Sequence, residues 1–208
     1  MTPVKERRKS FRDLFEHIKA RLDELDNVRN RVLNDRRDLL SSCRRAMNLI
    51  HSGETSTAKE IATGIKKRIV EIERICSDSS DKEMFCLINN VLRPIKQELV
   101  EVEILLSIIE GKSIPSPEDL GVGVVSYALG LADVIGELRR EVLIAISNNN
   151  LDLANQFLEW MRVLVEEISQ LAYPDSLIPI RHKIDVGRSL LDKTFSELLF
   201  YKTTGSLL

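Results

Sequence analysis

The sequence predicts an all-α protein of about seven helices, several of them long. Apolar residues recur at helical spacing almost throughout the 208 residues, and no stretch shows the period-2 alternation of a half-buried strand. Glycine and proline are scarce, at 9 and 6 residues, and they cluster between the periodic segments. Because 43% of the residues are hydrophobic and 30% charged, the composition is that of long amphipathic helices. We expect one domain over residues 1–208 with a sizeable core.

Polar turns and helix-breaking residues mark the ends of these helices. A helix over residues 7–25 is expected to be continuous with a long one over 27–51, which ends at Ser52-Gly53. Further helices are expected over about 55–76, 82–110, 124–147, 151–172 and 180–201. Pro94 predicts a kink or local break inside the helix over 82–110. The proline- and glycine-containing stretch 111–123 is expected to be a loop.

Charge is unevenly distributed along the chain, although the net charge is only −2. Residues 1–75 carry 18 Lys/Arg against 12 Asp/Glu, and residues 76–208 carry 12 against 20. A basic first third beside an acidic remainder fits a surface that holds a polyanion next to one that holds cations. The three cysteines have no metal-ligand spacing and indicate reduced thiols, with a Cys76–Cys86 bridge as the open alternative. No apolar run is long enough to span a membrane, so we expect a cytoplasmic protein.

Two pairs of carboxylates are the most informative feature. Glu98 and Glu101 are spaced i, i+3, and Asp133 and Glu137 are spaced i, i+4, so each pair lies on one face of its helix. Their neighbours are largely apolar. Acids held close together need protons or a cation to offset their repulsion. Two facing pairs would form an all-oxygen site suited to Mg²⁺ or Mn²⁺ and to phosphodiester cleavage.

The alternative for each pair is a solvated helix face, and for Glu98 and Glu101 alone this is the simpler interpretation. Asp133 is less ordinary because Gly130 and Gly136 flank it. A glycine inside a helix costs about 1 kcal/mol relative to alanine, and it often permits close approach of another backbone. A second helix that carries two more acids would need such an approach.

A polar stripe on the helix over 27–51 is the first candidate for nucleic-acid contact. Its members share one helix face: Asn34, Arg37, Ser41, Arg44, Asn48 and His51. Arginines there can contact phosphates without reading sequence, although a solvated charged face is an equal alternative. Aromatic residues are only 5% of the chain, so a base-stacking platform is poorly supported. His17, His51 and His182 lack ligand spacing and are expected to be surface or capping residues.

The two acidic segments resemble the translin superfamily. Gln97-Glu98-Leu99-Val100-Glu101 is similar to the helical carboxylate motif of translin-associated factor X, and Leu129-Gly130-Leu131-Ala132-Asp133-Val134-Ile135-Gly136-Glu137-Leu138 resembles its second motif. Leu14-Phe15-Glu16-His17-Ile18-Lys19-Ala20 is similar to translin itself. The resemblance covers about residues 10–200 and suggests an archaeal-type member.

This resemblance implies a seven-helix superhelical bundle that assembles into a hollow homo-octamer with RNA inside. It also implies a metal-dependent endoribonuclease, because Glu98, Glu101, Asp133 and Glu137 all match as catalytic and metal-binding residues. The basic, histidine-containing motif of translin has no clear match here. Candidate nucleic-acid contacts are therefore Arg37, Arg44, Arg45, Lys66, Lys67, Arg68 and Arg140. The alternative is a non-catalytic translin-like protein that binds single-stranded DNA or RNA.

Overall fold

The computed structural model describes residues 4–77 and 81–204, which form seven helices and no strand. The helices are α1 Val4–His51, α2 Thr55–Ser77, α3 Lys82–Ile109, α4 Pro117–Leu120, α5 Val124–Ser147, α6 Leu151–Ser169 and α7 Arg181–Thr204. The all-α prediction is therefore confirmed, and the first two expected helices are one helix of 48 residues. None of the described helices meets the length and apolarity that a membrane crossing requires.

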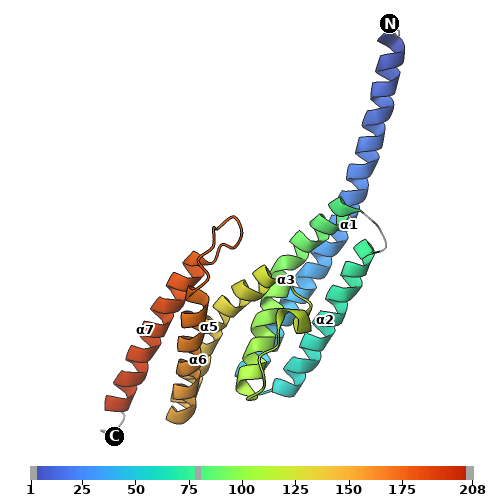
Figure 1. Cartoon of the computed structure of the whole chain (residues 1–208). Coiled ribbons are helices and arrows are strands. Elements are labelled where there is room, and N and C mark those ends of the chain that lie inside the picture. Colours follow the sequence, from blue (N-terminus) through green and yellow to red (C-terminus); the bar gives the residue numbers. More distant parts are fainter. Residues whose placement is uncertain (1–3, 78–80, 205–208) are drawn as a thin grey trace.

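Helices α1, α2 and α3 pack against one another, and α5 joins this group to α6 and α7 (Figure 1). The first half of α1 extends beyond the other helices. The apolar core runs continuously through the packed parts of the seven described helices and includes the fully buried Ile65, Leu92, Ile104, Leu138 and Met161. Since α3 and α5 both lie inside this arrangement, side chains on their facing surfaces are partly shielded from water.

Several helix ends follow directly from the local sequence. Asp81 caps α3 by accepting hydrogen bonds from the backbone N–H groups of Glu83 and Met84. Ser116 and Asp119 form a reciprocal capping box at the start of α4. The expectation that residues 111–123 form only a loop is thus wrong at α4, where this capping box and Pro117 stabilise a single helical turn.

Pro94 was expected to cause a kink or a local break, and the break does not occur, because α3 continues through this residue to Ile109. Val91, Leu92 and Ile95 are buried on either side of Pro94. Their packing against neighbouring helices holds the turn in place despite the lost backbone hydrogen bond, which is a case of tertiary contacts overriding a local preference.

Gly130 lets α5 approach α3 closely. A Cβ built at Gly130 would lie 2.8 Å from the carbonyl oxygen of Gln97 and 2.7 Å from Cβ of Val100. No larger residue fits without moving one helix. The expected role of a glycine here is therefore confirmed. The same expectation for Gly136 is wrong, because the nearest atom to a Cβ there is Leu190 Cδ1 at 4.0 Å.

Candidate acidic site between α3 and α5

The close approach at Gly130 brings the two acid pairs together. Asp133 and Glu137 on α5 both raise the pKa of Glu98 and of Glu101 on α3, so all four charges lie within interaction range. Sequence reasoning could foresee each pair and its helix face. The contact between the pairs depends on packing, and the structure provides it.

Glu101 is the most buried of the four acids, with 8% of its surface exposed. Burial raises its pKa to about 9, and Asp133, Glu98 and Glu137 add to the shift by repulsion. Burial is also the main reason that the pKa of Glu98 is raised, followed by the charge of Asp133. In the absence of a bound cation, Glu101 therefore holds a proton at neutral pH.

A lysine from the last long helix contacts this group of acids. Lys183 Nζ donates to both carboxylate oxygens of Asp133, with Oδ2 at 2.6 Å. Gln97 Nε2 donates to the same Oδ2 atom. Asp133 is thus held by one residue from α3 and one from α7, and neither residue stood out in the sequence. Lys183 lies in Arg181-His182-Lys183, which reads as an ordinary polar helix start.

His51, at the end of α1, also contacts the acidic group, through Glu137. Its side chain is 3% exposed, and its Nε2 and Nδ1 atoms lie 2.7 Å from Glu137 Oε2 and 2.6 Å from Glu141 Oε1. Burial lowers the pKa of His51, but the hydrogen bonds to Glu137 and Glu141 outweigh it and the pKa is raised. Both ring nitrogens can donate only in the imidazolium form, so the geometry favours a protonated His51.

The expectation that His51 is a surface or capping residue is therefore wrong. It lies at the end of α1, where it would seem exposed, but α5 packs against this end and covers it. His17 and His182 are exposed as expected. The partners of His51, Glu137 and Glu141, lie one turn apart on α5, and Glu141 is buried.

The donor set suits a divalent cation in its chemistry, since it offers carboxylate oxygens from Glu98, Glu101, Asp133 and Glu137. The side chains are not arranged around one point, however. Within residues 4–77 and 81–204, no three His, Cys, Asp or Glu side chains form a group that could hold a metal ion. Lys183 and His51 occupy oxygens of Asp133 and Glu137, so a cation would have to replace or rearrange these contacts.

The candidate nucleic-acid residues divide into two groups. Arg44 on α1 lies near the acids, because its charge lowers the pKa of Glu98, and Arg140 lies near His51, whose pKa it lowers. Both are exposed, as are Arg37, Arg45 and Lys67, and none of the five pairs with an acid in the described part of the chain.

The remaining two candidates are already paired with acids. Lys66 Nζ lies 2.7 Å from Glu103 Oε1. Arg68 NH2 lies 2.7 Å from Asp35 Oδ1, and its NH1 lies 2.9 Å from Glu71 Oε2. Binding of a phosphate by either side chain would compete with these ion pairs, so Arg44 and Arg140 are the better placed candidates beside the acids.

Cys43 adjoins the acids from α1. Burial raises the pKa of its thiol to about 12, and the charges of Glu98 and Glu101 add to the shift. The thiol is therefore protonated and inert at neutral pH. Cys43 and Cys86 are both free. The side chain of Cys76, the other partner in the alternative of a Cys76–Cys86 bridge, lies outside the described residues.

We compared the sequence and the fold with those of known proteins. No protein-family model matches the chain. The chain is 31% identical over 178 residues to an uncharacterized protein of Methanocaldococcus jannaschii, which covers 85% of this chain and 77% of that protein. The crystal structure of AfC3PO superposes with a TM-score of 0.79 at 26% identity, over 91% of this chain and 97% of that one.

Two further solved structures have a similar fold. AfC3PO in complex with duplex RNA gives a TM-score of 0.76 at 26% identity, with the same coverage of both chains. Apo-NeC3PO gives 0.78 at 16% identity over 89% of this chain and 96% of that one, which shows a shared fold. Because it shares the AfC3PO fold at 26% identity over 91% of its length, the chain belongs to the translin/C3PO family.

Proposed function

We propose that this protein is a divalent-metal-dependent endoribonuclease that acts within a hollow homo-oligomer, an octamer by family resemblance. The convergence of Glu98, Glu101, Asp133 and Glu137 between α3 and α5 is the observation that carries the proposal. Mutual repulsion of the acids, which raises the pKa of Glu98 and Glu101, is costly unless protons or a cation compensate it. AfC3PO, which shares the fold, was solved with duplex RNA, and this supports RNA as the substrate class.

In this proposal the four acids hold Mg²⁺ or Mn²⁺. The cation, when bound, supplies Lewis acidity at the scissile phosphate. Hydrolysis breaks one P–O ester bond, with the oxygen of water going to phosphorus and its proton finally to the leaving oxygen. Arg44 and Arg140 lie where they can bind adjacent phosphates. Lys183 is close enough to contribute a positive charge, since its ammonium group already lies against Asp133.

The second candidate is a translin-like RNA- or single-stranded DNA-binding protein without catalysis. One observation favours it, namely that Lys183 and His51 already pair with Asp133 and Glu137. Such internal compensation would let the acids serve the fold alone. The basic residues of α1 would still bind a nucleic-acid backbone, because phosphate contacts need no metal.

Cleavage of labelled RNA, single-stranded and duplex, with Mg²⁺, Mn²⁺ or EDTA distinguishes the two. We expect cleavage by the wild type with either cation and none in EDTA. Asp133→Ala, Asp133→Asn and Glu101→Gln should abolish cleavage while RNA affinity and oligomer mass persist. Asp192→Asn, an exposed acid on α7, is the control and should cleave normally. Wild-type cleavage by Asp133→Ala would exclude these acids as the site, and binding without cleavage by the wild type would favour the second candidate.

A further inference from the structure

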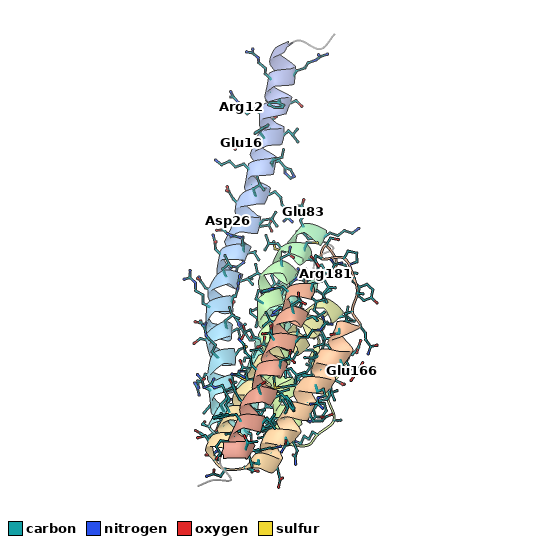
Figure 2. The ribbon with its side chains drawn as sticks, turned by 90° about the vertical axis from the view of Figure 1, so that its left-hand side faces the viewer. Arg12, Glu16, Asp26, Glu83, Glu166 and Arg181 are labelled. Atoms are coloured by element: carbon teal, nitrogen blue, oxygen red, sulfur yellow. The ribbon has the colours of Figure 1, made fainter. Side chains whose placement is uncertain are left out.

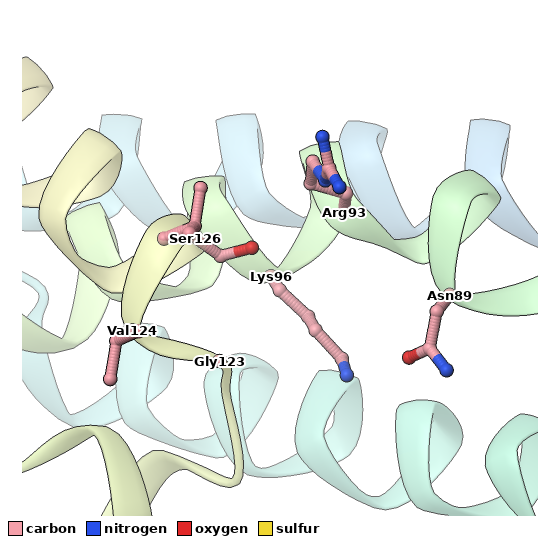
Figure 3. Close-up of a pocket in the computed structure, with 7 residues that line it drawn as sticks. Asn89, Arg93, Lys96, Gly123, Val124 and Ser126 are labelled. Carbon is pink, nitrogen blue, oxygen red and sulfur yellow. The ribbon is translucent and has the colours of Figure 1, made fainter. Parts of the chain in front are cut away.

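A small polar pocket lies between α3 and the first turn of α5, apart from the four acids. Asn89, Arg93 and Lys96 of α3 line one side, and Gly123 and Ser126 line the other (Figure 3). Its volume is about 250 Å³. This is below the range of about 300–1,000 Å³ typical of sites for drug-sized molecules. The pocket is therefore suited to a small polar ligand.

The start of α5 gives this pocket unsatisfied hydrogen-bond donors. Gly123 occupies the N-cap position and has no side chain to cap the helix. The backbone N–H groups of Val124, Val125 and Ser126 consequently have no acceptor within the helix. Since α5 is 24 residues long, its N-terminal end also carries a substantial positive partial charge. Such an end is a favourable place for an anion.

Ser126 is a second, independent feature of the pocket that points to a ligand. It is only 7% exposed, yet it forms no hydrogen bond with any other residue that the structure describes. Figure 3 shows its hydroxyl projecting into the pocket. No buried side-chain oxygen or nitrogen atom lacks a hydrogen-bond partner in the described part of the chain, so this hydroxyl is unpaired because it opens onto the pocket. The hydroxyl of Ser126 is therefore available to donate to a group bound in the pocket.

The charged side chains of α3 determine the sign of that group. Arg93 is exposed and forms no ion pair in the described part of the chain. Lys96 is 8% exposed, and its Nζ lies 2.5 Å from Glu73 Oε1 on α2, so Glu73 offsets one of the two positive charges. Asn89 Nδ2 donates to Phe85 O and keeps a second hydrogen. With the end of α5 included, the pocket is positive and rich in donors.

We propose that this pocket binds a phosphate group. The first turn of α5 and Ser126 would donate hydrogen bonds to its oxygens, and Arg93 and Lys96 would supply charge. No residue of the acidic site lines the pocket, so the proposal does not depend on the ribonuclease activity. The phosphate could belong to inorganic phosphate, a mononucleotide or RNA, because all three present the same oxygens.

Calorimetric titration of the full-length protein with inorganic phosphate tests this, at ionic strength held constant with sodium chloride. The wild type should bind phosphate, and Ser126→Ala and Arg93→Gln should each weaken binding at least about ten-fold, as expected for the loss of one hydrogen bond to a charged group. Ser126→Ala keeps a helix-compatible residue. Arg31→Gln on α1 removes an exposed arginine elsewhere and should bind as the wild type does.

Glu73→Gln should change phosphate affinity in the opposite direction. Removing the acid that pairs with Lys96 should tighten phosphate binding several-fold, whereas a purely structural ion pair predicts no change in affinity. Absence of phosphate binding by the wild type, or equal affinity in the wild type and Ser126→Ala, would overturn the proposal. Competition by AMP and by 5′-hydroxyl RNA then identifies the molecule that carries the bound phosphate. Competition by AMP alone indicates a mononucleotide, and competition by the RNA indicates a backbone phosphate. If neither compound competes, the ligand is inorganic phosphate.

Discussion

Lys183 on α7 places its ammonium group against both carboxylate oxygens of Asp133 on α5, at 2.6 Å from Oδ2. Both side chains are less than one third exposed. Asp133 in turn raises the pKa of Glu98 and Glu101. Lys183 is therefore an internal counter-ion for the acidic site, and it lies where a divalent cation would need to reach Asp133.

Replacing Lys183 should have opposite effects on cation binding and on stability. Lys183→Gln removes the charge that competes for Asp133, so Mn²⁺ affinity measured by calorimetry should rise by about three- to ten-fold. In EDTA the same variant should melt at a lower temperature because acid repulsion is uncompensated. Lys193→Gln, an exposed residue of the same helix, should change neither quantity. Weaker Mn²⁺ binding by Lys183→Gln would show that Lys183 assists the site instead.

Glu101 should make stability depend on pH. Its unfolded pKa is 4.5 and its folded pKa is about 9, so between these values the folded state holds a proton that the unfolded state has released. Stability therefore falls as pH rises through this window. Glu101→Gln cannot lose that proton and should melt higher than the wild type in EDTA at pH 8, with little difference near pH 4. One pKa unit is worth about 1.4 kcal/mol, or at least about 3 °C for a chain of this size.

Melting curves across pH check this prediction. Glu159→Gln, an exposed acid on α6, is the control and should follow the wild-type curve. Addition of Mn²⁺ should restore stability to the wild type at pH 8, because a cation compensates the ionised acids. Parallel pH curves for the wild type and Glu101→Gln would mean that Glu101 does not hold the proton.

The sequence was sufficient for the six long helices, apart from the short α4, and for the faces of the acid pairs, because both follow from local spacing. Gly130 even signalled the close helix approach that the structure contains. Lys183, His51 and Gln97 could not be identified in this way. Each contacts an acid at least 36 positions away, and their spacing along the chain carries no trace of that contact. The tertiary packing of the helices therefore determines which acids are paired with a basic residue of the same chain.

Assembly of the protein is expected to involve α1. The apolar residues Phe157, Met161, Leu164 and Ile168 of α6 are buried in the chain's own core. Exposed apolar residues instead follow one another at helical spacing along the projecting half of α1. They are Phe11, Leu14, Phe15, Ile18 and Leu22. Figure 2 shows Arg12 and Glu16 on this stretch, with no other helix beside it. Such a stripe marks an interaction surface.

Charges placed in this stripe should dissociate the assembly. Leu14→Glu combined with Ile18→Glu should lower the mass measured by light scattering, because each carboxylate would be buried at an apolar contact. Helical content should remain, since neither residue contributes to the core. Arg12→Glu on the same stretch is the control. A wild-type mass equal to one 23.7 kDa chain would contradict the expectation of an oligomer.

Arg37 and Arg44 should contribute to RNA affinity through phosphate contacts. Both are exposed on α1, and neither pairs with an acid in the described part of the chain. Arg37→Gln and Arg44→Gln should each weaken RNA binding without altering sequence preference, and each should lower the slope of log affinity against log salt by roughly one. Glutamine is preferable to glutamate at position 44, because a new carboxylate near Glu98 would perturb the acids as well.

Affinity measured across a salt series separates these contacts from the acidic site. Asp133→Ala should bind RNA with the wild-type slope and fail to cleave it, whereas the arginine variants should cleave slowly because less RNA is bound. Cleavage by the arginine variants should recover when RNA is supplied in excess, since the acids are intact. Unchanged affinity and slope in both arginine variants would show that this face of α1 is only solvated. RNA would then be held elsewhere, and Lys67, which is exposed and unpaired among the described residues, would be the next residue to replace.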